Sequence, residues 1–127
     1  MTAAITLDMK KQRIRIHKKT LELLNNPEYV LILVNPHKSA IAVCPTDAGQ
    51  KDTLKITYND SDCEYYSKEL MTQLSKLRLF TDQSYTYRIK GNVLNNGRIA
   101  IFDMNDAVRY SDPPDQETNT TGSKSND

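Results

Sequence analysis

The chain has 127 residues, with 17 Lys plus Arg against 16 Asp plus Glu, two Cys, two His and no Trp. This length suits one domain and leaves little room for a second core. No stretch approaches the 18 or so apolar residues of a membrane-spanning helix, the first seven residues lack the apolar core of a secretion signal, and two cysteines do not make the disulfide framework of a small secreted scaffold. We therefore expect a cytoplasmic protein with reduced thiols and no membrane partner.

Charge is unevenly distributed along the chain. Residues 8–20 contain one acid, Asp8, and six basic residues, which are Lys10, Lys11, Arg13, Arg15, Lys18 and Lys19. Residues 111–127 contain four acids, one lysine and no large apolar side chain. The body of the chain is therefore basic and its end acidic, and this distribution says more about partners than the net charge of +1.

Three segments are expected along the chain. The polar composition of residues 111–127 predicts a disordered acidic tail, and residues 1–9 predict a flexible N-terminal arm, because termini often fray. Ile5, Leu7 and Met9 alternate with other residues and would also suit an edge strand within this arm. Residues 10–110 are expected to form a single α+β domain.

The first half of this domain predicts a strand, a short helix and a hairpin. Arg13–Ile16 alternates arginine with isoleucine, as in a strand with one apolar face. Lys18–Leu24 predicts a helix of one to two turns, which Asn25-Asn26-Pro27 ends because proline cannot continue a helix. Tyr29–Val34 and Ala40–Cys44 are apolar on both faces and predict two strands joined by a five-residue loop.

A half-buried strand and the principal helix are expected next. Thr53–Tyr58 alternates apolar and polar side chains and predicts a strand with one wet face. Ser61 and Glu64 have the S-x-x-E spacing of a capping box, which predicts an amphipathic helix over Ser61–Leu79. Its apolar face is expected to comprise the residues at helical spacing, which are Tyr66, Leu70, Met71, Leu74 and Leu77.

The last part of the domain predicts a second hairpin. Tyr85–Leu94 and Arg98–Phe102 predict two strands, and Asn95-Asn96-Gly97 between them supplies the positive φ angles of a tight turn. Asp103 is expected to cap a final helical turn over Met104–Val108. The sequence thus predicts a small, mostly antiparallel β-sheet or barrel with one principal amphipathic helix.

Cysteine and histidine side chains do not form a catalytic or metal-binding pattern. Cys63 would sit in the first turn of the expected helix, where thiol pKa values fall, but Cys44 and Cys63 are read more simply as small core or chance residues. Zinc requires four clustered ligands, whereas His17 and His37 are single residues in different elements and are expected to be exposed. We expect no metal site.

Carboxylates, glycines and tyrosines have similarly simple interpretations. Asp60, Asp62 and Glu64 are favourable at a helix N-terminus because of the helix dipole, and no glycines have phosphate-loop spacing. Tyr85 and Tyr87 could stack on bases, but core packing is the simpler account. We expect a non-enzymatic protein with no cofactor.

The basic cluster is the feature most suggestive of function. Arg13 and Arg15 should share the outer face of their strand, with Lys18 and Lys19 just beyond, and this compact patch could neutralise several DNA phosphates. It could equally be a solvated strand face, or a dock for the acidic tail or an acidic partner.

Arg13 to Leu24, followed by the two strands at Tyr29–Val34 and Ala40–Cys44, resembles the swapped-hairpin unit of AbrB/MraZ-like transcription regulators and MazE-type antitoxins. A second Arg-Ile-x-Ile string at Arg98–Ile101 resembles the second motif of tandem members. The resemblance implies an interlocked β-fold, usually dimeric, that binds DNA near the strand-to-helix corner. Carried over by position, the DNA-binding residues would be Arg13, Arg15, Lys18, Lys19 and Arg98.

Two functions from different classes follow from these features. The leading hypothesis is a small non-enzymatic DNA-binding regulator of transcription that uses the basic patch. The alternative is a protein-binding module, such as a phage or mobile-element accessory factor that inhibits or recruits a host protein. Either could act as a homodimer.

Overall fold

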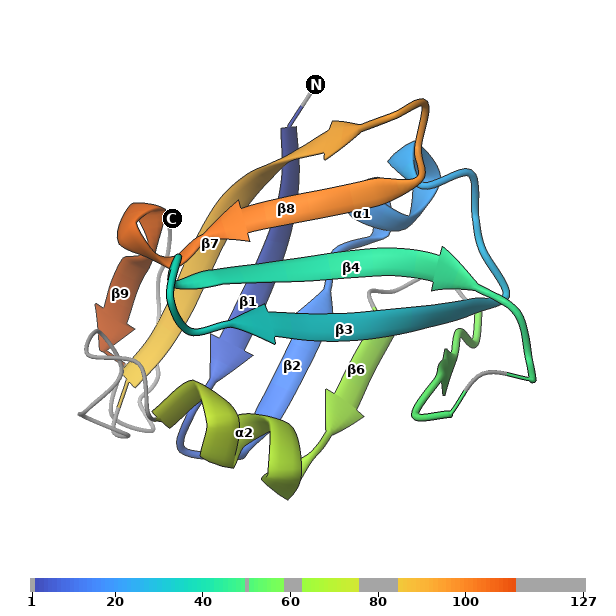
Figure 1. The fold of residues 1–127 in the computed structure, drawn as a ribbon. Helices are drawn as coiled ribbons and strands as arrows, with labels where there is room; N and C mark the ends of the chain where they lie inside the picture. The colour runs from blue at the N-terminus through green and yellow to red at the C-terminus, as the bar shows by residue number, and fades with distance from the viewer. Residues whose placement is uncertain (1, 50, 59–62, 76–84, 112–127) are drawn as a thin grey trace, which may run out of the picture.

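The protein folds into a curled, mostly antiparallel sheet with a few short helices, which confirms the predicted α+β class. The structure is a computed structural model that describes residues 2–49, 51–58, 63–75 and 85–111. Its elements are β1 (Thr2–Asp8), β2 (Arg13–Ile16), α1 (Lys18–Leu23), β3 (Tyr29–Asn35), β4 (Ala40–Thr46), β5 (Leu54–Lys55), β6 (Cys63–Tyr66), α2 (Lys68–Ser75), β7 (Tyr85–Leu94), β8 (Ile99–Asp103), η2 (Met104–Asp106) and β9 (Val108–Ser111). In Figure 1, β3, β4 and β8 cross the front of the molecule, and β1, β2 and β6 lie behind them.

The strands follow the order β5-β3-β4-β8-β7-β1-β2-β6, and neighbouring strands are antiparallel. The ten-residue strand β7 pairs with three other strands, β1, β8 and β9. One side of β7 pairs with β1, whereas the other side pairs with β9 near its start and with β8 near its end. The 3₁₀ turn η2 carries the chain from β8 to β9, so that both strands share one side of β7 (Figure 1).

β1 occupies a central place in the sheet, so the prediction of a flexible arm over residues 1–9 is wrong. It pairs with β2 on one side and with β7 on the other. Ala3, Ile5 and Leu7 are fully buried. The alternation of apolar residues at the N-terminus therefore reflects a buried strand face, and the long pairing with β7 prevents the fraying expected of a terminus.

The helix predicted from Ser61 begins later, because Cys63–Tyr66 forms strand β6. Tyr65 and Glu64 lie opposite Ile14 and Arg15 of β2, and this pairing overrides the capping-box spacing. Tyr66, expected on the buried helix face, is 69% exposed. Ser67 is the residue that caps α2, since its Oγ accepts a hydrogen bond of 3.1 Å from the Leu70 amide.

The apolar face of α2 is confirmed where the structure describes it. Met71 and Leu74 are buried and Leu70 packs against the core. Leu77 and the predicted helix end at Leu79 lie outside the described residues. The tail predicted over residues 111–127 begins too early, because Ser111 belongs to β9, and residues 112–127 lie outside the described part of the chain. No helix in the described ranges has the length and apolar character needed to span a bilayer.

Both predicted hairpins are confirmed. β3 and β4 pair over seven residues, from Tyr29 opposite Thr46 to Asn35 opposite Ala40. Asn95, Asn96 and Gly97 turn β7 into β8 with φ angles of 55°, 57° and 86°, and Asp103 accepts a hydrogen bond from the Asn105 amide, as a cap of η2 should.

The strand predicted over Thr53–Tyr58 is shorter, since β5 comprises only Leu54 and Lys55. Ile56 just beyond it is buried, as predicted, and Leu54 packs against the core. Tyr58 is exposed, and its hydroxyl donates a hydrogen bond to the carbonyl of Pro27. The segment after β5 is therefore joined to the residues just before β3 by the Tyr58 side chain and by a backbone hydrogen bond of 2.8 Å, which the Ile56 amide donates to the Glu28 carbonyl.

One core fills the inside of the curl, with the largest buried side chains drawn from most strands: Ile5, Leu7, Ile14, Ile16, Ile41, Ile89 and Phe102. Tyr87 is also buried, which confirms its predicted role in core packing. Gly91 allows β7 and β8 to approach closely, because a Cβ at that position would lie 2.3 Å from the Ile101 carbonyl oxygen and 2.5 Å from the Phe102 ring. A side chain there would force the two strands apart.

Candidate nucleic-acid interface

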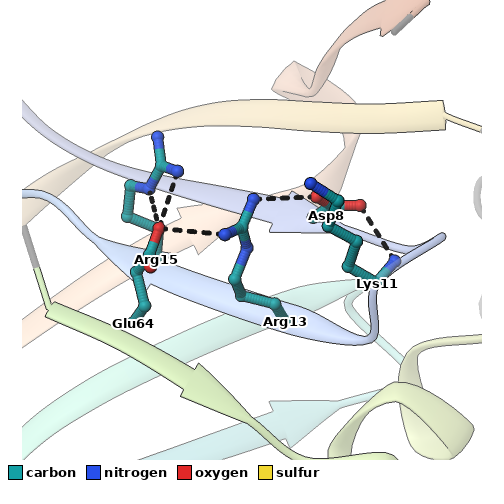
Figure 2. A network of polar contacts seen from close by, with 5 residues as sticks. All are labelled: Asp8, Lys11, Arg13, Arg15 and Glu64. Atoms are coloured by element: carbon teal, nitrogen blue, oxygen red, sulfur yellow. Dashed lines mark hydrogen bonds and ion pairs between the residues drawn. The ribbon is translucent and has the colours of Figure 1, made fainter. Parts of the chain in front are cut away.

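Arg13 and Arg15 lie on the outer face of β2, as their alternation with two isoleucines predicts. Ile14 and Ile16 are fully buried on the inner face. The arginines are directed toward the carboxylates of two neighbouring strands, Asp8 of β1 and Glu64 of β6 (Figure 2).

A network of ion pairs joins these four side chains. Arg13 contacts Asp8 Oδ2 at 3.0 Å and Glu64 Oε2 at 3.2 Å through its two terminal nitrogens. Arg15 contacts the same Glu64 oxygen through Nη2 at 2.7 Å and Nε at 2.9 Å. Asp8 Oδ1 also accepts a hydrogen bond from the Lys11 amide, which closes the β1–β2 turn. The network therefore links β1, β2 and β6, and two carboxylates balance two guanidinium groups.

Arg13 has the more enclosed position of the two, with 17% of its side chain exposed against 36% for Arg15. Burial opposes the charge of Arg13, but Glu64, Tyr66 and Asp8 together outweigh this effect and raise its pKa above the ordinary value. Arg13 thus stays charged and directs that charge to partners within the protein. We interpret Arg13 as a residue that holds the strands together rather than one that faces a ligand.

Two basic residues from β7, Arg88 and Lys90, join Arg15 on the outer face of the sheet. Thr6 of β1 is opposite Arg15 on one side and opposite Arg88 on the other. Residues directly opposite each other in a sheet project to the same face, so Arg15 and Arg88 flank Thr6 on that face. Lys90 follows two residues after Arg88, opposite Ala4, and both β7 side chains are exposed.

Sequence reasoning missed Arg88 and Lys90. The available signal was the alternation of Tyr87, Arg88, Ile89 and Lys90, in which the apolar residues are buried and the basic ones exposed. That pattern predicts an outward basic pair. Only the register across β1 shows that the pair belongs with a residue of β2.

Lys18 and Lys19, in the first turn of α1, are exposed at the end of β2. Thr20 anchors this turn to β1: its hydroxyl donates to the Ala4 carbonyl at 2.7 Å and accepts from the Ala4 amide at 2.8 Å. The two lysines therefore directly precede the residue that joins α1 to Ala4 of β1. Ala4 in turn lies opposite Lys90 of β7.

His17, predicted to be exposed, is half-buried and contacts β1. Its Nε2 lies 2.7 Å from Thr6 Oγ1, and its amide donates to the Ala4 carbonyl at 3.3 Å. The contact arises because β2 and β1 remain side by side up to the start of α1. His37, in contrast, is exposed in the β3–β4 loop, as predicted.

Arg98 lies apart from the arginine network. It is exposed just after the β7–β8 turn, and its amide donates to the Leu94 carbonyl at 3.2 Å. This turn contacts the segment that follows α1, since Asn25 Nδ2 donates to the Asn96 carbonyl at 3.3 Å. The structure therefore places Arg98 beyond the C-terminal end of α1, whereas Lys18 and Lys19 are at the N-terminal end.

We define the basic face as the outer surface over β7, β1, β2 and the start of α1, with five basic residues: Arg15, Lys18, Lys19, Arg88 and Lys90. Glu64 contacts this set through Arg15. Glu22, exposed on α1, is another acid nearby. The face thus carries an excess of positive charge.

The two cysteines have surroundings unlike those of a reactive thiol. Burial raises the pKa of the Cys44 thiol, which disfavours the thiolate, and the Cys63 thiol is buried and contacts the Thr57 carbonyl at 3.3 Å. Of the carboxylates weighed for cation binding, Glu64 is committed to the arginines, and Asp60 and Asp62 lie outside the described residues. Within the described ranges, the His, Cys, Asp and Glu side chains form no group of three suited to a metal ion.

No family model, no curated protein and no solved structure matches this chain significantly. The strand–helix–strand–strand order that carried the resemblance to AbrB/MraZ-like regulators and MazE-type antitoxins is present as β2, α1, β3 and β4. Membership of that family stays a prediction.

Proposed function

We propose that this protein is a small, non-enzymatic DNA-binding protein that contacts phosphates of duplex DNA through the basic face. The observation that carries the proposal is the register across β1, which brings Arg88 and Lys90 of β7 to the same face as Arg15 of β2. Phosphate neutralisation needs several basic groups spread over one open surface. The basic face provides five such groups. Arg13 is not one of them, because its guanidinium contacts Asp8 and Glu64.

The shape of the face favours contact with the DNA backbone rather than base reading. A helix or a two-stranded ribbon normally enters the major groove to read bases, whereas the basic face is a sheet surface and α1 has only six residues. We therefore propose sequence-tolerant binding within the cytoplasm, with any role in regulating transcription following from occupancy of the DNA.

Fluorescence anisotropy with the full chain and a random duplex, at about 50 and 200 mM salt, tests the proposal. If about three to five phosphates are contacted, log Kd should change steeply with log salt, with a slope of about 2.7 to 4.5. Replacing both Arg88 and Lys90 by alanine should weaken binding and lower this slope by about 2.

The matched control removes two lysines from elsewhere, Lys38 in the β3–β4 loop and Lys55 in β5, both exposed. It changes the net charge of the chain equally and should leave the affinity within about twofold. Equal losses in the two double variants would mean that net charge, rather than the basic face, governs binding. Absence of wild-type binding at about 50 mM salt would reject the proposal.

A further inference from the structure

The sheet has an apolar strand edge along β3. β3 pairs with β4 over its whole length, but on its other side only Tyr29 and Val30 have strand partners, which are Lys55 and Leu54 of β5. Among the described residues, Leu31–Asn35 have no strand partner on that side. In Figure 1, β5 lies near the start of β3 and leaves the rest of β3 without a neighbouring strand on that side. We call Leu31–Asn35 the free edge of β3.

The free edge lacks the features that usually protect a strand edge. Natural proteins protect such edges with charges, prolines, bulges or very short strands. Leu31, Ile32, Leu33 and Val34 are uncharged and apolar, and the register with β4 is continuous. Leu33 is 51% exposed, and Ile32 and Val34 are only partly buried. The strand at the far end of the sheet order, β6, is by contrast short and carries Glu64.

The outer face beside the free edge is also apolar. Leu33, Ala42 and Ile101 lie opposite one another across β3, β4 and β8, and Cys44 lies opposite Leu31 in the next row. Leu33 and Ile101 are among the exposed large apolar residues. These rows contain no charged residue, so a partner for this region should itself be apolar and uncharged.

An unpaired strand edge restricts the kind of partner further. Its backbone N–H and C=O groups form a regular row, and another extended strand is the element that can form a ladder of hydrogen bonds along the whole row. A second copy of β3 meets both requirements. In an antiparallel pair centred on Leu33, each Leu33 faces the same residue of the other copy, and Ile32 faces Val34. A two-fold axis makes this contact self-complementary.

We propose that two copies of this chain associate by antiparallel pairing of their free β3 edges, which joins the two sheets into one. Charge does not oppose the contact, because the net charge of each chain is only +1. The basic face lies beyond β4 and β8 in the strand order, so dimerisation leaves it open. The proposal is independent of DNA binding.

The expected affinity follows from the size of the contact. Pairing two five-residue edges buries less than the roughly 800 Å² per partner of a standard stable interface. The dimer should therefore be concentration-dependent, with a Kd in the range of about 1–100 µM. It should be absent at nanomolar concentration and populated at about 200 µM.

Sedimentation velocity of the full chain across this concentration range measures the association. Leu33→Lys should raise the dimer Kd at least about tenfold, because two lysines would face each other at the two-fold axis. Leu33 projects from the outer face, so the monomer should tolerate the change, and the melting temperature checks this. Leu94→Lys is the matched control, since Leu94 is comparably exposed at 45% but lies at the end of β7, away from the free edge.

A cross-linking experiment fixes the register. Leu33→Cys should form a covalent dimer with a short bifunctional maleimide, whereas the wild type, which has Cys44 and Cys63, and Leu94→Cys should give far less. A monomer at all concentrations overturns the proposal, as does a dimer equally sensitive to Leu33→Lys and Leu94→Lys. If the chain dimerises but Leu33→Cys does not cross-link, the pairing of β3 edges is rejected. If the monomer instead binds a different protein through β3, a second copy of this chain is rejected as the partner.

Discussion

Arg15 holds Glu64 through two nitrogens, Nη2 at 2.7 Å and Nε at 2.9 Å, across the β2–β6 pair. This two-point contact orients the guanidinium of Arg15 toward the protein. Because Arg15 is also the β2 member of the basic face, Glu64 competes with any phosphate for the same donors. If the basic face binds DNA as proposed, Glu64 weakens that binding by occupying Arg15.

Glu64→Gln should therefore strengthen DNA binding. The change removes an acid from the basic face and releases Arg15, so affinity at about 50 mM salt should rise about two- to fivefold, with a steeper salt dependence. Stability should fall by about 0.5–1 kcal/mol, because the pair is partly exposed. Asp106→Asn alters the net charge equally at an exposed site in η2. If both variants gained affinity equally, local competition at Arg15 would be refuted.

Arg13→Ala should destabilise the fold more than Arg15→Ala. Asp8 is 5% exposed and contacts Arg13 at 3.0 Å, so the loss of Arg13 leaves a buried carboxylate without its ion-pair partner. We expect a cost of about 1–3 kcal/mol for Arg13→Ala and about half of that or less for Arg15→Ala. Urea unfolding of both variants measures the difference, and equal costs would contradict the structural role assigned to Arg13.

Gly91→Ala should be among the most destabilising small substitutions in the described part of the chain. Its Cβ would lie 2.3 Å from a backbone oxygen of β8, and relieving that contact requires β7 and β8 to separate. We expect a loss of about 2–3 kcal/mol or more. Gly49→Ala is the control, because a Cβ there meets nothing within 4 Å. Thermal unfolding that gave the same melting temperature for both variants would show that the strands yield easily.

Stability should fall in alkaline solution partly through Tyr65. Burial, with smaller contributions from Cys63 and Tyr58, raises the pKa of the Tyr65 hydroxyl to about 12, and this hydroxyl donates to the Lys55 carbonyl at 2.5 Å. The unfolded chain releases this proton near pH 10, whereas the folded chain keeps it to about pH 12. The contribution of the Tyr65 hydroxyl to the free energy of unfolding is therefore complete below pH 10, and it is lost as the pH rises toward 12.

Unfolding of the wild type, Tyr65→Phe and Tyr29→Phe at pH 9 and pH 11 tests this assignment. Tyr65→Phe should lose less stability between the two pH values than the wild type does, because phenylalanine has no proton to release. Tyr29→Phe should retain the wild-type decrease. An undiminished alkaline decrease in Tyr65→Phe would assign the effect to other groups.

Local signals were sufficient for much of the fold. The two asparagines and the glycine at residues 95–97 predicted the β7–β8 turn, and Asn25-Asn26-Pro27 predicted the end of α1, because positive φ angles and the missing proline amide act within a few residues. The apolar alternation of β2 and β7 likewise predicted their buried faces. These features need no knowledge of distant partners.

Non-local pairing decided the features that local signals misplaced. Ser61 and Glu64 have the spacing of a helix start, yet Glu64 lies in β6 because β2 offers a paired strand and two guanidinium groups. For the same reason, the sequence predicted only some residues of the basic face. Arg15, Lys18 and Lys19 are close in sequence, whereas Arg88 and Lys90 join Arg15 only through the register with β1.

The position of β1 between β2 and β7 also sets the order in which the molecule can assemble. Thr2 lies opposite Asn92, so two neighbouring strands inside the sheet, β1 and β7, come from distant parts of the chain. The β1–β2 and β3–β4 hairpins are local and can form while the chain is still being made, whereas the other edge of β1 remains unpaired until β7 is available. During that interval the edge of β1 that later pairs with β7 is a free strand edge, which favours aggregation of the incomplete chain.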